Sequence, residues 1–485
     1  MVNFKIVSKI IGQLLFLESM FMSWCLIMAL CYREDDVMAF LMSIILAVGC
    51  GLIFMYFGRN ASNNLSRRDA SLTVTLVWII FSFFGMMPFL IGGYINNVAG
   101  AYLETMSGFT TTGATVIDNV ECLPHGILFW RSLTHWIGGL GIVFFTIAVL
   151  PSMVGGSVKI FAAEATGPIK SKMHPRLTTS AKWIWIVYIG LTLACVLSYY
   201  FTGMGWFDSF CYSMSTTATG GFGTHNTSIS YFHSPPLEYA ASLFQFLSGV
   251  NFVLLYTCVV KGKFKSMFVN SEFRLYVMVV LCCSAWIAYT LVSQMGYDVE
   301  HAIRSALFQV VSFLTTTGLY SDDAGKWPHI TWLILSFCMF IGACSGSTTG
   351  GFKCVRGVMV LKVVRNEFRQ IFHPNAVLPV KIDGQPIPQS KISALLAFFA
   401  LYVLVLLIAA TIMIMTGIDK IDAITISLSS MSNVGPALGR QIGPTMSWSI
   451  LPDGIKWICS LLMLMGRLEV MTVLVIFTRA FWKEN

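Results

Sequence analysis

Four copies of one short sequence pattern recur along this chain. Each copy is an apolar segment that ends in small or hydroxyl residues followed by glycine, and the copies lie about 100 residues apart. They occupy 106–115, 215–222, 313–319 and, in degenerate form, 430–436. The fold must therefore place four equivalent units, and we align them on Gly113, Gly220, Gly318 and Gly435.

The composition is that of a protein folded in lipid. Of the 485 residues, 56% are hydrophobic and 11% are charged, whereas soluble proteins carry about a quarter of their residues as charges. The 13 cysteines include no CxxC pair and no histidine cluster at zinc spacing. We interpret them as small buried side chains, so the sequence predicts an integral membrane protein without a disulfide framework or a cysteine metal site.

Ten apolar segments are candidates for membrane helices, because about 20 helical residues cross the hydrocarbon layer. They lie near 8–31, 37–57, 72–95, 124–150, 182–203, 236–260, 274–295, 328–343 continuing to about 370, 392–416 and 454–480. Lys5 and Lys9 precede the first segment as in a signal peptide, but no small-residue cleavage site follows, so we expect an uncleaved helix. The sequence predicts an all-α protein with ten transmembrane helices.

The basic residues predict the orientation. Of the 31 Lys and Arg residues, 23 fall on the side of the two chain ends and six on the opposite side, while Arg131 and Arg467 lie within or at the edge of spans. The first group includes Lys159, Lys170, Lys172 and Arg176. Because cytoplasmic loops retain Lys and Arg, both termini are expected in the cytoplasm. The net charge of +8 then needs no nucleic-acid partner.

A short apolar segment precedes each of the four turns. These segments lie at 101–110, 207–217, 301–315 and 420–431. A helix of this length reaches about 16 Å, half the thickness of a bilayer, so each can enter the membrane from outside but cannot cross it. Four units of helix, half-helix, turn and helix would then be parallel repeats around one central axis.

The predicted organisation is an N-terminal helix pair at 1–70, followed by pore repeats at 71–180, 181–270, 271–390 and 391–485. Irregular backbone at membrane depth survives only where protein buries it or where it lines an aqueous cavity. Four converging turns would present rings of oxygen atoms, which can replace the hydration shell of a monovalent cation. The partly negative C-terminal ends of the half-helices favour a cation as well. The pattern therefore predicts a cation pore.

Further motifs carry a resemblance to a known family. They are Trp130-Arg131, THWIGGLGI at 134–142, SGVNF at 248–252, GACSGSTTGGFK at 342–353 and GRLE at 466–469. With the four turns, they make residues 70–485 resemble the TrkH/KtrB/HKT superfamily of potassium transporters, and the leading helix pair resembles its bacterial TrkH branch. The resemblance implies a four-repeat pore in each protomer of a homodimer in the bacterial inner membrane.

In that family a ring of backbone oxygens surrounds potassium. The resemblance carries this role to Thr111, Thr112, Gly113, Ala218, Thr219, Gly220, Thr316, Thr317, Gly318, Asn433, Val434 and Gly435. Members with serine at the first filter glycine tend to pass sodium, so Gly113 implies potassium (K+). The fourth segment departs from the Thr-Gly pattern, which leaves open which of its carbonyls bind the ion. A cytosolic ring of TrkA-like nucleotide-binding subunits is also implied; it would sense ATP or NAD(H), because this chain has no Rossmann fingerprint.

Residues 343–352 interrupt an apolar span with small and hydroxyl side chains that do not continue a helix. The run lacks the GK[ST] of a phosphate loop and follows no strand, so we expect an intramembrane loop below the filter, and the resemblance implies that it occludes the pore. Its candidate gating residues are Gly346, Ser347, Thr348, Thr349, Gly350 and Gly351. Arg467 is expected either to face the cavity below the filter or to pair with Glu469, Glu104 or Asp208.

Other residues have expected roles beside the pore. Arg131 is expected to brace the first filter segment, and His135 to pack or hydrogen-bond. Glu104 and Asp208 are expected near the starts of their half-helices, where a carboxylate is favoured by the helix dipole. The basic segment 356–391 is expected either to anchor in lipid headgroups or, from the resemblance, to dock the nucleotide-binding ring.

Three functions remain open from the sequence. The first is potassium uptake through a gated, channel-like pore with no chemical step. The second is a proton- or sodium-coupled symporter, for which few buried carboxylates are available. The third is a membrane-embedded enzyme, which needs a nucleophile and base or a metal cluster, and His135 and His174 have no evident partners at ligand spacing. We therefore predict a transport protein and no enzyme.

Overall fold

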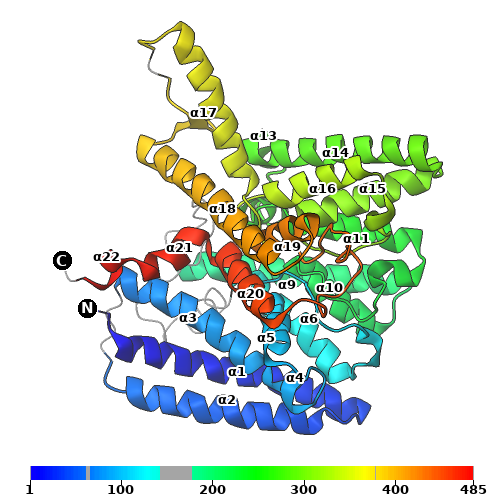
Figure 1. The fold of residues 1–485 in the computed structure, drawn as a ribbon, viewed down its shortest axis with the longest axis vertical. Coiled ribbons are helices and arrows are strands. Elements are labelled where there is room, and N and C mark those ends of the chain that lie inside the picture. The colour runs from blue at the N-terminus through cyan, green and yellow to red at the C-terminus, as the bar shows by residue number, and fades with distance from the viewer. Residues whose placement is uncertain (1, 62–65, 142–176, 377, 484–485) are drawn as a thin grey trace.

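The computed structural model describes residues 2–61, 66–141, 177–376 and 378–483, and it is built almost wholly of helices (Figure 1). The end of the predicted span 124–150 lies outside the described residues, as do His174 and the basic residues Lys159, Lys170, Lys172 and Arg176. The N- and C-terminal ends lie close together on one side of the molecule (Figure 1), as the predicted topology requires.

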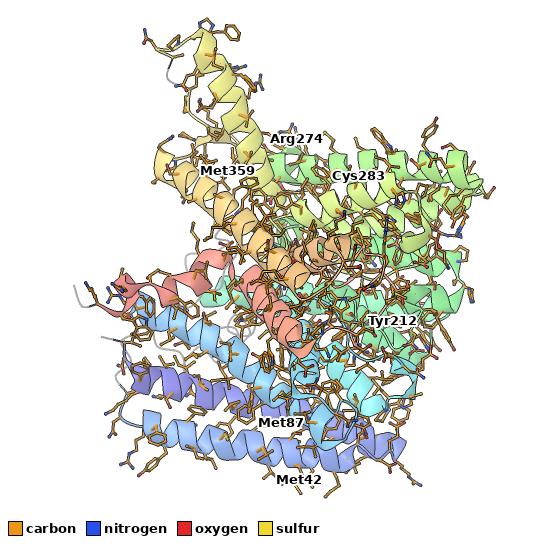
Figure 2. All side chains as sticks on the ribbon, in the orientation of Figure 1. Met42, Met87, Tyr212, Arg274, Cys283 and Met359 are labelled. Atoms are coloured by element: carbon orange, nitrogen blue, oxygen red, sulfur yellow. The ribbon has the colours of Figure 1, made fainter. Side chains whose placement is uncertain are left out.

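Within the described residues, six helices are long and apolar enough to cross a membrane. They are α1 (Phe4–Tyr32), α2 (Val37–Gly58), the run Arg68–Ile91 formed by α3 (Arg67–Gly85) and α4 (Met87–Ile91), α9 (Leu177–Phe201), α14 (Ser271–Met295) and α18 (Gln389–Met415). Apolar side chains such as Leu41, Met42 and Ile45 of α2 are exposed, and Met42 lies at the edge of the molecule (Figure 2). Such outward-facing apolar surface fits lipid as the solvent.

Two predicted spans are sharply bent. The helices α11 (Pro235–Ser248) and α12 (Phe252–Val259) meet at 106°, and α20 (Asp453–Leu468) meets the run Val470–Phe477, which begins with α21 (Val470–Leu474), at 112°. The prediction of continuous helices at 236–260 and 454–480 is therefore wrong. Asn251 starts α12 by accepting a hydrogen bond from the Val253 N–H. Glu469 ends α20 because its φ of 65° is not helical.

A third span is interrupted, as predicted for 343–352. The short apolar helix α16 (His329–Ile341) ends before a non-helical segment, and α17 (Cys354–Phe372) then projects from the bundle (Figure 1). A small antiparallel hairpin of β1 (Lys381–Ile382) and β2 (Gln385–Pro386) leads back to α18. Two further short helices are α13 (Lys265–Val269) and α22 (Arg479–Trp482).

Four short helices lie ahead of the four Thr-Gly turns. They are α5 (Val98–Phe109), α10 (Trp206–Ala218), α15 (Val299–Leu314) and α19 (Lys420–Ser432). Side-chain caps start three of them, from Asn97, Asp298 and Asp419. The helices that follow the turns are α6 (His125–Gly139), α11, α16 and α20. Almost every residue of the last two turns of each short helix is buried, so their C-terminal ends meet inside the protein.

Candidate functional site

All four short helices end with the same hydrogen-bonded motif. The residue at each end has a left-handed backbone: φ is 55° at Thr111, 56° at Thr219, 55° at Thr316 and 57° at Asn433. The next N–H bonds to a carbonyl five residues earlier, which is always that of a serine: Thr112 to Ser107 (2.8 Å), Gly220 to Ser215 (2.9 Å), Thr317 to Ser312 (2.8 Å) and Val434 to Ser429 (3.0 Å). This is the Schellman motif, in which glycine is usual at the left-handed position. Three threonines there are strained, and surrounding contacts must hold them.

The motif corrects the predicted register of the second segment. A glycine of positive φ follows two residues after each left-handed residue: Gly113 (82°), Gly221 (85°), Gly318 (76°) and Gly435 (95°). The second segment is thus Thr219-Gly220-Gly221, and the prediction of Ala218, Thr219 and Gly220 is displaced by one residue. Ala218 is still the last residue of α10. The sequence misleads here because Gly220 and Gly221 are adjacent, and an alignment on the first of them shifts the segment by one residue.

These four glycines form a closed ring of contacts with carbonyl oxygens of neighbouring segments. A Cβ atom added at Gly113 would overlap the carbonyl oxygen of Gly220. The same holds around the ring, for Gly221 against Thr317, Gly318 against Val434 and Gly435 against Thr112. Each oxygen belongs to the middle residue of the next segment, and the fourth segment returns to the first. Only glycine satisfies both the positive φ and this close approach.

A cavity of about 140 Å³ adjoins the ring, and all four positive-φ glycines line it. Charged and titratable side chains at its wall are Asp118, Arg131, His225 and Tyr320. Gly221, and not Gly220, is the lining residue of the second segment. The cavity therefore supports the corrected register independently of the backbone angles.

The intramembrane loop touches the left-handed residues of the ring. The Thr219 hydroxyl donates to Thr348 Oγ1 at 3.2 Å, and the Gly350 N–H donates to Thr316 Oγ1 at 2.8 Å. A Cβ atom at Gly350 would also overlap the carbonyl oxygen of Ser432, next to Asn433.

The other predicted gating residues lie within the loop. Ser347 Oγ donates to the Cys344 carbonyl at 2.5 Å and lies 2.8 Å from Thr349 Oγ1. Gly346 and Gly351 have positive φ of 72° and 75°, which turns the chain at the two sides of this segment. Thr348 and Gly350 are thus the loop residues in contact with the ring.

Arg467 lies between the loop, the first filter segment and the end of α6. Its Nη1 donates to the Thr348 carbonyl at 2.7 Å and to Thr111 Oγ1 at 3.4 Å. Its Nη2 donates to the carbonyls of Gly138 (2.5 Å) and Gly139 (2.6 Å). Arg467 therefore contacts Thr111 of the first turn and Thr348 of the loop, and the expectation that it faces a cavity below the filter stays a prediction.

Each carboxylate named as an alternative partner of Arg467 bonds to another side chain. Glu104 pairs with Arg131, Glu469 pairs with Arg356 at 2.5 Å, and Asp208 accepts a hydrogen bond from Thr224 at 2.7 Å.

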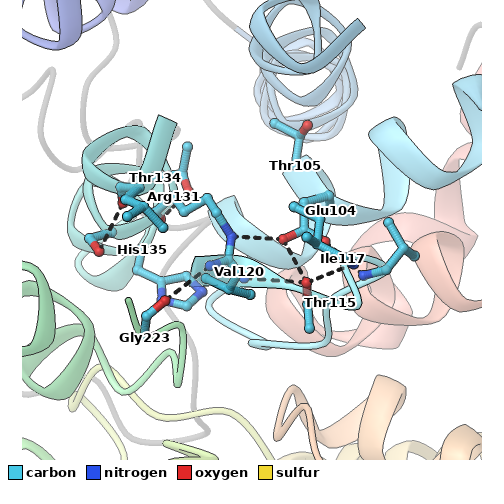
Figure 3. A network of polar contacts seen from close by, with 12 residues as sticks. Glu104, Thr105, Thr115, Ile117, Val120, Arg131, Thr134, His135 and Gly223 are labelled. Atoms are coloured by element: carbon cyan, nitrogen blue, oxygen red, sulfur yellow. Dashed lines mark hydrogen bonds and ion pairs between the residues drawn. The ribbon is translucent and has the colours of Figure 1, made fainter. Parts of the chain in front are cut away.

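A buried ion pair supports the chain that follows the first two turns (Figure 3). Arg131 Nε lies 2.9 Å from Glu104 Oε1, and the two side chains are 2% and 0% exposed. Arg131 also donates to the Gly223 carbonyl at 3.0 Å and to Thr115 Oγ1 at 3.3 Å, while Glu104 Oε2 accepts from the Val116 N–H. Arg131 therefore ties the chain after Gly113 to the chain after Gly221, and its expected role of bracing a filter stays a prediction.

The structure decides the expectations for three neighbouring residues. Asp208 lies in the first turn of α10, as predicted, whereas the first turn of α5 holds no acidic residue. The helix-dipole role expected for Glu104 is therefore wrong, because α5 begins earlier than predicted and Glu104 bonds to Arg131 instead. His135 packs and hydrogen-bonds as expected: it stacks on Phe222 and lies 3.0 Å from Ser215 Oγ.

Sequence reasoning missed two contacts of this site. Asn433 Nδ2 donates to Thr112 Oγ1 at 3.0 Å and to the Met463 carbonyl at 2.9 Å, which links the fourth segment to the first. Asn is the non-glycine residue that best tolerates a left-handed backbone, which agrees with its place in the fourth segment where the other three segments have threonine. Lys353, with φ of 79°, bonds through Nζ to Thr349 inside the loop.

Comparisons with known proteins give the family. The profile described as "TrkH: Cation transport protein" matches residues 37–484. "Trk system potassium uptake protein TrkH" of Salmonella typhimurium is 35% identical over 99% of this chain and 100% of its own length. "Trk system potassium uptake protein TrkG" of Escherichia coli is 32% identical over 99% of both. The crystal structure of the potassium transporter TrkH from Vibrio parahaemolyticus superimposes with a TM-score of 0.89 at 33% identity, covering 99% of this chain and 100% of that one. The resemblance inferred from the motifs is thereby confirmed, and the chain belongs to the TrkH family of cation transport proteins.

Proposed function

We propose that this protein takes up potassium across the bacterial inner membrane through a gated, channel-like pore that is selective for potassium. The observation that carries the proposal is the closed ring in which each filter glycine abuts a carbonyl oxygen of the next segment. Such a ring offers oxygen ligands to a cation that has shed its water. The relatives named above as potassium uptake proteins support potassium as the ion.

The proposed membrane arrangement has ten crossings, four parallel pore repeats and an extra N-terminal pair. Six long helices and the two bent pairs account for up to eight crossings within the described residues. The interrupted segment α16–α17 and the segment that begins with α6 would be the other two. Both termini would face the cytoplasm, because the side that carries them holds most of the Lys and Arg residues.

The proposed gate is the intramembrane loop together with Arg467. Thr348 and Gly350 bond to the bottom of the ring, and Arg467 joins the loop to the first repeat. A potassium ion leaving the ring would meet this loop and a guanidinium charge. Conduction therefore requires the loop to move, and we take the arrangement described here as the closed one.

The proposed partners are a second copy of this chain and a cytosolic TrkA-like nucleotide-binding ring, which would supply ATP or NAD(H) control. The projecting helix α17 is the surface with which they would interact. It exposes Leu361, Phe368 and Phe372 beside Arg365 and Arg369. An exposed apolar face of this kind fits a partner protein or lipid.

A proton-coupled symporter is the second candidate function, and one observation favours it. Glu18 of α1 is 0% exposed, and its two carboxylate oxygens make no hydrogen bond within the described part of the chain. A buried carboxyl of this kind inside a membrane span is a candidate proton carrier. It lies against Gly85 of α3, behind the half-helix α5, and so outside the filter.

The function is tested by cation flux into liposomes that contain the purified full chain. Potassium, sodium and lithium are compared for the intact protein and for a variant lacking residues 344–352. We expect potassium-selective flux that is larger in the deletion. A folded deletion variant that passes no cation, or that does not distinguish potassium from lithium, would exclude the filter.

A pH gradient across the same liposomes separates the two candidates. An uncoupled pore gives a potassium flux that follows the potassium gradient alone. A symporter gives flux driven by the pH gradient that disappears in Glu18→Gln.

A further inference from the structure

The two ends of the intramembrane loop are held by one carboxylate that belongs to neither the loop nor the filter. Glu272 is the second residue of α14 and is 6% exposed. Its Oε1 accepts hydrogen bonds from the Ser345 N–H at 2.6 Å and from the Val355 N–H at 3.1 Å, and Ser345 Oγ donates to Oε2 at 3.3 Å. Hydrogen bonds from neutral donors to a carboxylate are stronger than those to neutral acceptors.

Glu272 acts where the loop leaves the helices and returns to them. The Cys354 N–H bonds to the Ala343 carbonyl at 2.9 Å, and the Phe352 N–H bonds to the Phe340 carbonyl at 3.0 Å. The chain that enters the loop and the chain that leaves it therefore lie side by side. On the entering side the Cys344 N–H also bonds to the Gly249 carbonyl at the α11–α12 bend. Ser345 and Val355 lie just beyond these hydrogen-bonded residues, and Glu272 of α14 bonds to both.

The carboxylate is also reached from a cavity of about 310 Å³. Residues of the loop ends, of the start of α14, of the β1–β2 hairpin and of the first turn of α18 line this cavity together: Ser345, Val355, Asn270, Glu272, Asp383 and Lys391. Asp383 of the hairpin accepts hydrogen bonds from the Ser271 N–H at 2.9 Å and from Ser271 Oγ at 2.6 Å. The hairpin that follows α17 is thus fastened to the residue next to Glu272.

We propose that Glu272 is a positioning residue of the gate, whose carboxylate latches both ends of the loop and so determines how readily Thr348 and Gly350 leave the filter ring. The latch rests on the proposed function, because it assigns control of flux to the loop. It extends that function by joining the loop to the α17 hairpin through consecutive residues of α14, Ser271 and Glu272. Movement of the hairpin therefore reaches the loop without passing through the filter.

The test uses the full chain in liposomes and reads the loop directly. Cys344 and Cys354 are native cysteines at the two ends of the loop, and both are 0% exposed. Cys459 of α20 is also 0% exposed and serves as the internal reference. A methanethiosulfonate reagent is applied, and the modification rate of each cysteine is measured by mass spectrometry alongside potassium flux.

We expect Glu272→Ala to raise the modification rate of Cys344 by about tenfold or more, the effect of losing about 1.4 kcal/mol of latching free energy, and to raise potassium flux as well. Cys459 should stay unmodified. Glu272→Gln keeps an oxygen acceptor for the two N–H groups and should give a smaller rise. Glu300→Ala removes a half-exposed carboxylate on α15 and is the matched control, with no change expected.

The outcomes separate the latch from the transport function. The latch is overturned if Cys344 is modified at the same rate in Glu272→Ala as in the chain without a substitution. It is also overturned if the modification rate of Cys459 rises in parallel, which would indicate general loosening of the protein. If Cys344 reacts faster but no variant passes potassium, the latch stands and the proposed transport function fails. If Glu272→Ala does not fold, Glu272→Gln decides: an unchanged Cys344 rate in that variant also overturns the latch.

Discussion

Replacing Arg467 by glutamine should open the pore. The side chain joins α20 to two other parts of the molecule, because it donates to the loop at the Thr348 carbonyl and to the end of α6 at the Gly138 and Gly139 carbonyls. Only the first of these bonds must break when the loop moves. The other two tie the guanidinium to a part of the protein that stays in place.

The magnitude follows from that single bond. A hydrogen bond from a charged donor contributes about 1.5–3 kcal/mol, and the Arg467–Thr348 distance of 2.7 Å is that of a well-formed bond. Its loss should raise the population of the displaced loop by about 10- to 150-fold, since each 1.4 kcal/mol is a factor of ten. Loss of the positive charge acts in the same direction, because it removes repulsion of a potassium ion leaving the ring.

The assay is the initial rate of potassium uptake into liposomes at equal protein content, with thermal unfolding in detergent as the check on folding. Arg467→Lys is the matched control: it keeps the charge but loses the forked geometry that reaches three carbonyls. We expect the glutamine variant to exceed the lysine variant, and both to exceed the unmodified chain. Unchanged or reduced flux in a glutamine variant that unfolds at the same temperature would refute the assignment of Arg467 to the gate.

Three further predictions concern the filter and its surroundings. Gly318→Ala places a Cβ atom against the Val434 carbonyl at a φ of 76°, so potassium-over-sodium selectivity measured by flux should fall about tenfold or more. The control is Gly296→Ala, which has a φ of 68° and open space around it. It should cost about 1–2 kcal/mol of stability and leave selectivity unchanged. Glu104→Ala leaves Arg131 buried without its carboxylate partner, so the free energy of unfolding should fall by about 3–5 kcal/mol. The double variant Glu104→Ala/Arg131→Met should recover stability. Equal melting temperatures of the single and double variants would contradict this. Asp118 lies in the segment between α5 and α6, and hydrogen bonds from Ser447 and Ser449 lower its pKa. The stabilisation by Asp118 is therefore complete above a pH of about 4 and is lost as pH falls through the lower folded pKa. Asp118→Asn should remove that part of the acid dependence of thermal unfolding, and an acid profile identical to that of the original chain would show that these bonds do not contribute to stability.

Much of the architecture could be predicted from hydropathy and glycine positions. Spans appeared as apolar runs because lipid leaves little room for charge, and the interruption at 343–352 appeared as a run that cannot continue a helix. The bends at Asn251 and Glu469 were not predicted. Glycine and polar residues such as Gly249 and Arg467 lie beside them, but they interrupt the apolar runs only briefly. The direction of the chain after each break depends on where the loop and Arg356 lie.

The sequence by itself determined that four half-helices end in glycine-containing turns, and that three of those glycines are Gly113, Gly318 and Gly435, because a lone glycine after a helix leaves one choice of position. Only the tertiary structure decided that the remaining glycine, that of the second segment, is Gly221. Gly220 and Gly221 are equivalent in local propensity, and contact with the Thr317 carbonyl across the ring distinguishes them. The partners of Arg467 and Glu272 were decided in the same way, since residues far apart in the chain become donor and acceptor only when the helices are packed.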